Sequence, residues 1–161
     1  MTMVETMVLI SMVALIGGGS LGILMGGLTG WSRGSSTSYA DTSASLAAQK
    51  VAIEIRDGQL GSVASNRLTV TLPQETTGAN QESCYNRGVS GQTRQYWLSG
   101  ANLMRTVAGA DSIVARGVSS ATFSVSGPRV TIIIDGREQN GRYTTTKTVA
   151  IMVRLRNFNS T

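Results

Sequence analysis

The chain has 161 residues, of which 41% are hydrophobic and only 14% are charged, and its net charge is +5. It has no histidine and a single cysteine, Cys84, which excludes Ser-His-Asp and Cys-His catalytic sets, a cysteine and histidine zinc site and an intrachain disulfide. About 30 apolar residues at the N-terminus leave roughly 130 for one small domain, and the remaining composition favours a secreted β-rich domain over a cytosolic enzyme.

Residues 1–30 form an apolar segment in which Glu5 is the one charged side chain. A helix from Thr6 to Gly30 would be roughly 37 Å long, enough to cross a hydrocarbon layer of about 30 Å. Because an ionised side chain in a membrane helix is costly and usually marks a functional contact, Glu5 needs a positive partner. The nearest candidate is the α-amino group of Met1, in its own chain or in a neighbouring copy.

The run Met1-Thr2-Met3-Val4-Glu5-Thr6-Met7-Val8-Leu9-Ile10 resembles the mature N-terminus of type IV pilins and pseudopilins. The resemblance implies that a short basic leader is removed before Met1, that the Met1 amine is methylated, and that Met1 and Glu5 set the register between subunits. Phenylalanine is more usual at the first position, and many pilins carry a C-terminal disulfide that this chain cannot form. The alternative is an initiator Met1 and an accidental match.

Glycines that we expect to control packing and flexibility follow within the apolar segment: Gly17, Gly18, Gly19, Gly22, Gly26 and Gly30. From Gly18 to Gly30 they recur every four residues, a spacing that lets helix backbones approach closely in an apolar environment. Each glycine also costs about 1 kcal/mol relative to alanine in a helix. In filaments of the resembled family this helix often melts in the middle, so we expect any melted stretch at residues 17–22.

Residues 31–58 are predicted to form the amphipathic second half of the same helix, ending at Gly58. The predicted buried stripe consists of Ala44, Ala48, Val51 and Ile55. Trp31 and Arg33 suit the membrane–water interface, where aromatic and long basic side chains settle.

Residues 59–161 are predicted to form a β-sheet head, because apolar and polar residues alternate. The predicted strands are 68–72, ending at Pro73; 95–100 and 103–107, a hairpin around Gly100; 121–125 and 130–134, joined at Gly127-Pro128; and 148–155. Residues 74–91 are predicted to be a long loop or irregular edge, and Asp135-Gly136 to open a polar connection. In the last strand one face carries Val149, Ile151, Val153 and Leu155.

The resulting fold class is α+β: a long N-terminal helix, membrane-embedded in its first half and amphipathic in its second, packed on an antiparallel β-sheet in a type IV pilin-like way. The runs at residues 96–105, 117–123 and 153–157 are also similar to minor pseudopilins of the J class.

The sequence predicts no enzyme, and no catalytic, cofactor or metal site. Asp135, Glu138 and Asn140 could supply oxygen ligands, but a polar turn explains them better. Asn159 begins a glycosylation sequon. The basic residues are spread from Arg33 to Arg156 without a dense run, which favours a solvated surface over a nucleic-acid groove and leaves weak DNA or surface binding as the alternative.

The resemblance implies a structural subunit of an extracellular type IV pilus-like filament of identical subunits. Such a chain would stay in the inner membrane until prepilin peptidase and the pilus assembly machinery process and incorporate it. One alternative is a minor pseudopilin at the tip of a type II secretion-like pseudopilus. Another is a membrane-anchored binding or sensor domain that never assembles. Motility, adhesion, DNA uptake and secretion all stay open.

Overall fold

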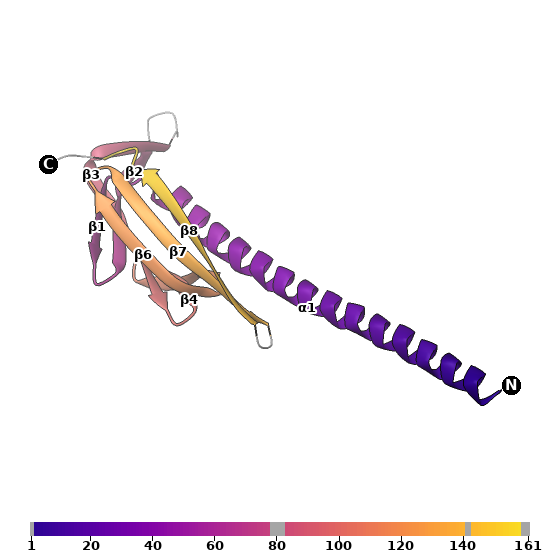
Figure 1. The fold of residues 1–161 in the computed structure, drawn as a ribbon. Helices are drawn as coiled ribbons and strands as arrows, with labels where there is room; N and C mark the ends of the chain where they lie inside the picture. The colour runs from indigo at the N-terminus through magenta and orange to yellow at the C-terminus, as the bar shows by residue number, and fades with distance from the viewer. Residues whose placement is uncertain (1, 78–82, 141–142, 159–161) are drawn as a thin grey trace.

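The computed structural model describes residues 2–77, 83–140 and 143–158, without the side chains of residues 76–90. A long helix, α1 (Met3–Ile55), leaves a β-sheet head at one end and extends far beyond it (Figure 1). The expected α+β class with antiparallel strands is confirmed. The Cys84 side chain, Met1 and Asn159 lie outside the described part of the chain.

The head contains two sheets rather than the single sheet that we expected. A five-stranded sheet comprises β1 (Leu60–Ala64), β2 (Arg67–Thr77), β3 (Ser83–Ser99), β4 (Asn102–Val107) and β5 (Ala110–Arg116) in sequential order. A three-stranded sheet comprises β6 (Val118–Ser126), β7 (Arg129–Asn140) and β8 (Tyr143–Arg154). All pairs are antiparallel hairpins. Between the sheets, Gly117 adopts a φ of 73°, which redirects the chain so that β6 starts a new sheet instead of pairing with β5.

The predicted hairpins at Gly100 and Gly127 are confirmed, and both glycines have positive φ. For residues 74–91 we expected a long loop or an irregular edge. The loop is wrong for the described backbone, because β2 continues to Thr77 and β3 starts at Ser83, but the pairing of these strands is irregular. The pairing register shifts on both sides of Pro73, as expected for a residue that cannot donate to the ladder. Strands β1 and β5 lie outside the predicted set.

In the single chain, α1 is continuous through residues 17–22, where we expected any melted stretch of a filament helix. Melting in a filament therefore stays a prediction. The helix ends at Ile55, three residues before the predicted stop at Gly58. Gly58 is required for a different reason: a Cβ there would lie 2.6 Å from Cγ1 of Val70, so the glycine lets the chain leave the helix against β2.

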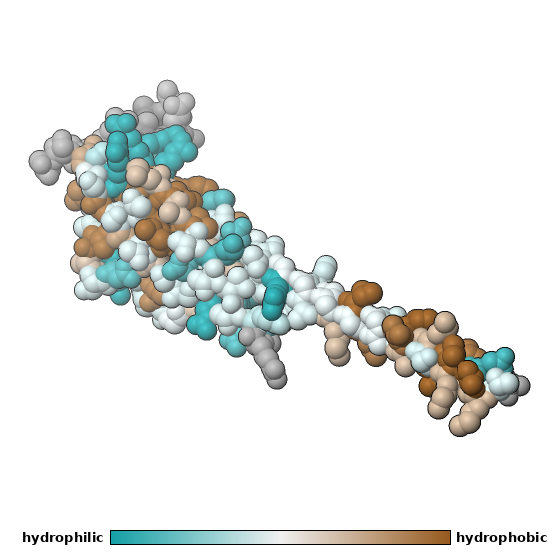
Figure 2. Space-filling view, in the orientation of Figure 1, coloured by the Kyte–Doolittle hydropathy of each residue, from teal (hydrophilic) through white to brown (hydrophobic). Residues whose placement is uncertain are grey.

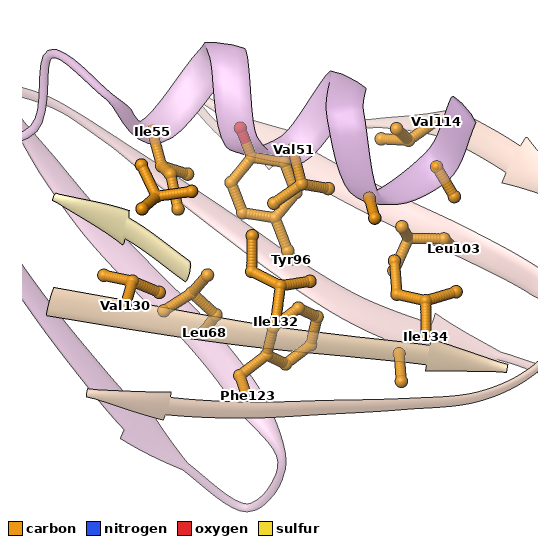
Figure 3. Packing of buried hydrophobic residues seen from close by; sticks show 14 of the residues in the cluster. Val51, Ile55, Leu68, Tyr96, Leu103, Val114, Phe123, Val130, Ile132 and Ile134 are labelled. Atoms are coloured by element: carbon orange, nitrogen blue, oxygen red, sulfur yellow. The ribbon is translucent and has the colours of Figure 1, made fainter. Parts of the chain in front are cut away.

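The buried stripe of α1 changes in size along the head. Its members are Ser36, Ala40, Ala44, Ala47, Ala48, Val51 and Ile55, so small residues precede large ones. The small end lies where β7 crosses closely. The large end meets Tyr96, Leu68 and Val130, which fill the wider space between helix and sheets (Figure 3). Burial of each large side chain contributes about 1.5–3 kcal/mol.

Gly136 makes the close crossing feasible. A Cβ at this position would overlap the carbonyl oxygen of Ala40 and would lie 2.9 Å from Oγ of Ser43. Our expectation that Asp135-Gly136 opens a connection is wrong, because β7 continues to Asn140 and Gly136 pairs with Lys147 of β8. The glycine belongs to the strand because the helix backbone occupies the place of a side chain. On the predicted apolar face of the last strand, Val153 in β8 and Leu155 just after it are buried in the same core.

We predict that Gly136→Ala destabilises the head by about 1–3 kcal/mol, the usual cost of adding a methyl group to a well-packed contact. Denaturant unfolding of the full chain in detergent, followed by near-UV circular dichroism, measures this loss. Gly34→Ala is the matched control, because a Cβ at Gly34 has open space and should be neutral or stabilising. Equal stability of both variants would contradict the close crossing.

Candidate assembly surface on the N-terminal helix

The first half of α1 is an uncovered apolar surface. Every residue from Thr2 to Leu28 is exposed, and the head first covers the helix around Thr29 and Ser32. Figure 2 shows brown hydrophobic side chains along this part of the helix, in addition to a second brown area on the head. The large ones are Met3, Val4, Met7, Val8, Leu9, Ile10, Met12, Val13, Leu15, Ile16, Leu21, Ile23, Leu24, Met25 and Leu28. A surface of this extent on a helix marks contact with lipid or protein.

Among the described residues, α1 is the one helix that is long and apolar enough to cross a membrane. Its apolar part lies near the N-terminus and is not buried by any other part of the chain. It therefore differs from the core helix of a soluble protein, which passes the same length test but is covered.

Glu5 takes part in the N-terminal cap of α1. The backbone N–H of Thr2 donates a hydrogen bond to Oε2 of Glu5 at 2.8 Å, which satisfies a donor that a helix start otherwise leaves unpaired. An acid in the first turn also interacts favourably with the helix dipole. Sequence analysis missed this role, although Thr followed three residues later by Glu is a recognisable capping pattern. The expected pairing of Glu5 with the Met1 amine stays a prediction.

The predicted packing glycines have no partner within the described chain. A Cβ built at any member of the set would find no other atom within 4 Å; the set is Gly17, Gly18, Gly19, Gly22, Gly26 and Gly30. Intrachain packing therefore gives no reason for these glycines, in contrast to Gly58 and Gly136 in the head. Their predicted role in close helix contacts concerns other molecules and stays a prediction.

A polar cluster at the end of α1 fixes the helix to the five-stranded sheet. Oε1 of Glu54 accepts a hydrogen bond from Arg105 of β4 at 2.8 Å, and Oε2 accepts one from the Tyr96 hydroxyl of β3 at 2.6 Å. Arg94 donates to the Glu54 carbonyl oxygen at 3.2 Å. The segment after β8 returns to the same helix end, where the Arg156 N–H donates to the Arg56 carbonyl oxygen. The helix that carries the apolar surface is thus firmly attached to the head.

Burial raises the pKa of Tyr96 well above that of an ordinary tyrosine, and its hydrogen bond to Glu54 acts in the same direction. The Tyr96 ring is fully buried among core side chains, yet its hydroxyl reaches the carboxylate on the helix. The residue therefore joins the apolar core to the polar cluster.

The oxygen atoms that could have bound calcium lie in a strand and not in a turn. Asp135, Glu138 and Asn140 all belong to β7, and the Asp135 carboxylate accepts a hydrogen bond from the Thr148 hydroxyl at 2.6 Å. Among the described residues, no three His, Cys, Asp or Glu side chains gather as a metal site would require.

We predict that the Tyr96 hydroxyl does not ionise until the head unfolds. Because its folded pKa is raised, its contribution to stability is present below the unfolded pKa of about 10 and is lost as the pH rises above it. Absorbance titration of the full chain should show one tyrosine that ionises only with the unfolding transition. Tyr96→Phe should remove that step and lower the free energy of unfolding at pH 7 by about 1–2 kcal/mol. A phenol that still ionises late in Tyr96→Phe would contradict the assignment.

No family model matches the chain, and no curated protein or solved structure shows a significant match to it. A long apolar N-terminal helix packed on antiparallel β-sheet is a pilin-like arrangement, and its exposed hydrophobic half is the kind of surface that a filament subunit uses.

Proposed function

We propose that this chain is a structural subunit of an extracellular type IV pilus-like filament, in which the exposed halves of α1 from many copies form the core. Before assembly the same helix would hold the chain in the inner membrane, where a prepilin peptidase and the assembly machinery would act on it. The observation that supports this proposal most strongly is the uncovered apolar surface from Met3 to Leu28. In water such a surface is unfavourable, since each large side chain contributes about 1.5–3 kcal/mol when it is buried.

This part of the helix forms its backbone hydrogen bonds internally, but its apolar side chains are not covered by the rest of the chain. This arrangement suits both a membrane and a helical bundle, because both surround the side chains with apolar groups and offer the backbone no hydrogen-bond partners. The glycines with open space around them suit close approach of a second helix. The head is joined to the helix through the Gly136 crossing and the Glu54 cluster, so it would form the outer surface of the filament.

Glu5 would neutralise the N-terminal amine of an adjacent copy inside this core. Its hydrogen bond to the Thr2 N–H uses one carboxylate oxygen, and Oε1 has no hydrogen bond within the described chain. Capping and pairing are therefore compatible. They also respond differently to substitution, because glutamine can replace glutamate in a cap but carries no charge.

We predict that Glu5→Gln retains the helix cap and loses assembly, while Glu5→Ala loses both. An unpaired amine in an apolar core costs about 3–5 kcal/mol, enough to reduce assembly by well over tenfold. Sedimentation and electron microscopy of fibres measure assembly, and near-UV circular dichroism verifies that the head remains folded. Asp41→Asn, which removes an exposed carboxylate from the same helix, should assemble normally. Normal fibres from Glu5→Gln would show that capping is the whole role of Glu5.

The glycines give a second test. Gly22→Ala and Gly26→Ala should each stabilise the helix of the isolated chain by up to about 1 kcal/mol, because the added methyl group meets nothing. In the filament the same methyl groups would separate packed helices, so the fibre yield should fall. Helix content in detergent and fibre yield are measured in parallel. A fibre yield that rises together with helix stability would contradict close packing at these glycines.

A further inference from the structure

The length of the apolar part of α1, from Glu5 to Trp31, matches the thickness of a bilayer. Glu5 and Trp31 are 26 residues apart, which corresponds to about 39 Å along a helix axis. A bilayer has a hydrocarbon layer of about 30 Å and measures about 40–45 Å with its headgroup regions. With Glu5 at one interface, Trp31 therefore lies at the other. Trp31 is 79% exposed, so its ring is free to sit among headgroups.

The β7–β8 hairpin reaches the same level of the helix. In Figure 1 this hairpin runs along α1 towards the helix N-terminus. At its end, Tyr143 pairs with Asn140, and the guanidinium carbon of Arg33 lies 4.5 Å from the centre of the Tyr143 ring. Arg33 is two residues, or about 3 Å, beyond Trp31 along the axis. A residue 110 positions later in the chain thus lies at the level where a bilayer that begins at Glu5 would end.

The two aromatic residues lie on different sides of the helix. Trp31 precedes the buried Ser36 by five residues, so it points about 140° away from the face that the head covers. Tyr143 lies on the side of the head, against Arg33. Contact with an interface on two sides restrains the tilt of a helix more than contact on one side does.

Arg33 is equipped to bind phosphate. Among the residues that the structure describes, its guanidinium stacks on Tyr143 and forms no ion pair with a carboxylate. The planar group keeps its N–H donors in its own plane, and that geometry suits phosphate oxygens. Stacking holds the plane in place without using those donors.

We propose that Arg33, Tyr143 and Asn140 rest on the headgroup layer of the membrane that holds the chain, with Arg33 bound to phospholipid phosphate. The hairpin then braces the head against the bilayer and fixes its orientation before assembly. This inference rests on the membrane-held state in the proposed function, and it assigns a lipid surface as the partner of Arg33, Tyr143 and Asn140.

The test uses the full chain in phosphatidylcholine vesicles that contain a lipid with a nitroxide on its headgroup. Cys84→Ser removes the native thiol, and a fluorophore is attached to Asn140→Cys. The matched control carries the fluorophore at Ser126→Cys, an exposed site at the opposite end of the three-stranded sheet. We expect quenching at Asn140 to be several-fold stronger than at Ser126. Adding Arg33→Gln and Tyr143→Ser should reduce that difference. Equal quenching at the two sites overturns the proposal.

A second measurement separates this proposal from filament formation. In Trp97→Phe, Trp31 is the only tryptophan, and its depth follows from quenching by nitroxides placed along the lipid. We expect the strongest quenching from the headgroup position. Strongest quenching from the middle of the acyl chain, or none at all, overturns the assignment of levels. The fibre assays of the Glu5 variants involve no vesicles, so they test the filament separately. If those assays contradicted the filament, the chain could still be a membrane anchor whose hairpin contacts the bilayer.

Discussion

The head depends on the close crossing of α1 and β7, where Gly136 faces the carbonyl oxygen of Ala40. A side chain in place of Gly136 would push the strand away from the helix. Because the strand lies so close, the β7–β8 hairpin runs beside the second half of the helix for most of the hairpin's own length (Figure 1). The same crossing sets the wedge shape of the core, with small residues at one end and Val51, Ile55 and Tyr96 at the other.

One helix serves two environments, and the change between them is sharp. Up to Leu28 its side chains are exposed and, apart from Glu5 and a few Ser and Thr residues, apolar. From Ser36 onwards a stripe of small and then larger residues is buried by the head. A head alone would not need the first half. The exposed half is therefore the basis of the proposed function, and the head holds it in a fixed orientation. The Glu54 cluster contributes to that orientation by joining the last turn of the helix to β3 and β4.

Glu5 illustrates how a single carboxylate can have a local and an intermolecular role. Locally it completes the helix start by accepting a hydrogen bond from Thr2. In an apolar assembly the same charge would require a cation, since an isolated ion is costly there. The local role explains why an acid is tolerable at this position in the free chain. The intermolecular role would depend on the negative charge of Glu5, whereas the cap depends only on its ability to accept a hydrogen bond.

The sequence by itself determined the long helix, its apolar first half and the main strands, because these depend on residue periodicity over short stretches. It also determined the buried face of the last strand, where Val153 in β8 and Leu155 just after it enter the core as expected. It did not determine the extent of β2, β3 and β7, since their outer parts are polar and lack a period of two. Asp135-Gly136 has the composition of a turn, and only the helix packed against it explains a glycine within a strand. The division into two sheets, the Glu54 to Tyr96 contact and the stacking of Arg33 on Tyr143 were decided by tertiary structure alone, because each joins residues far apart in the chain whose proximity no local pattern encodes.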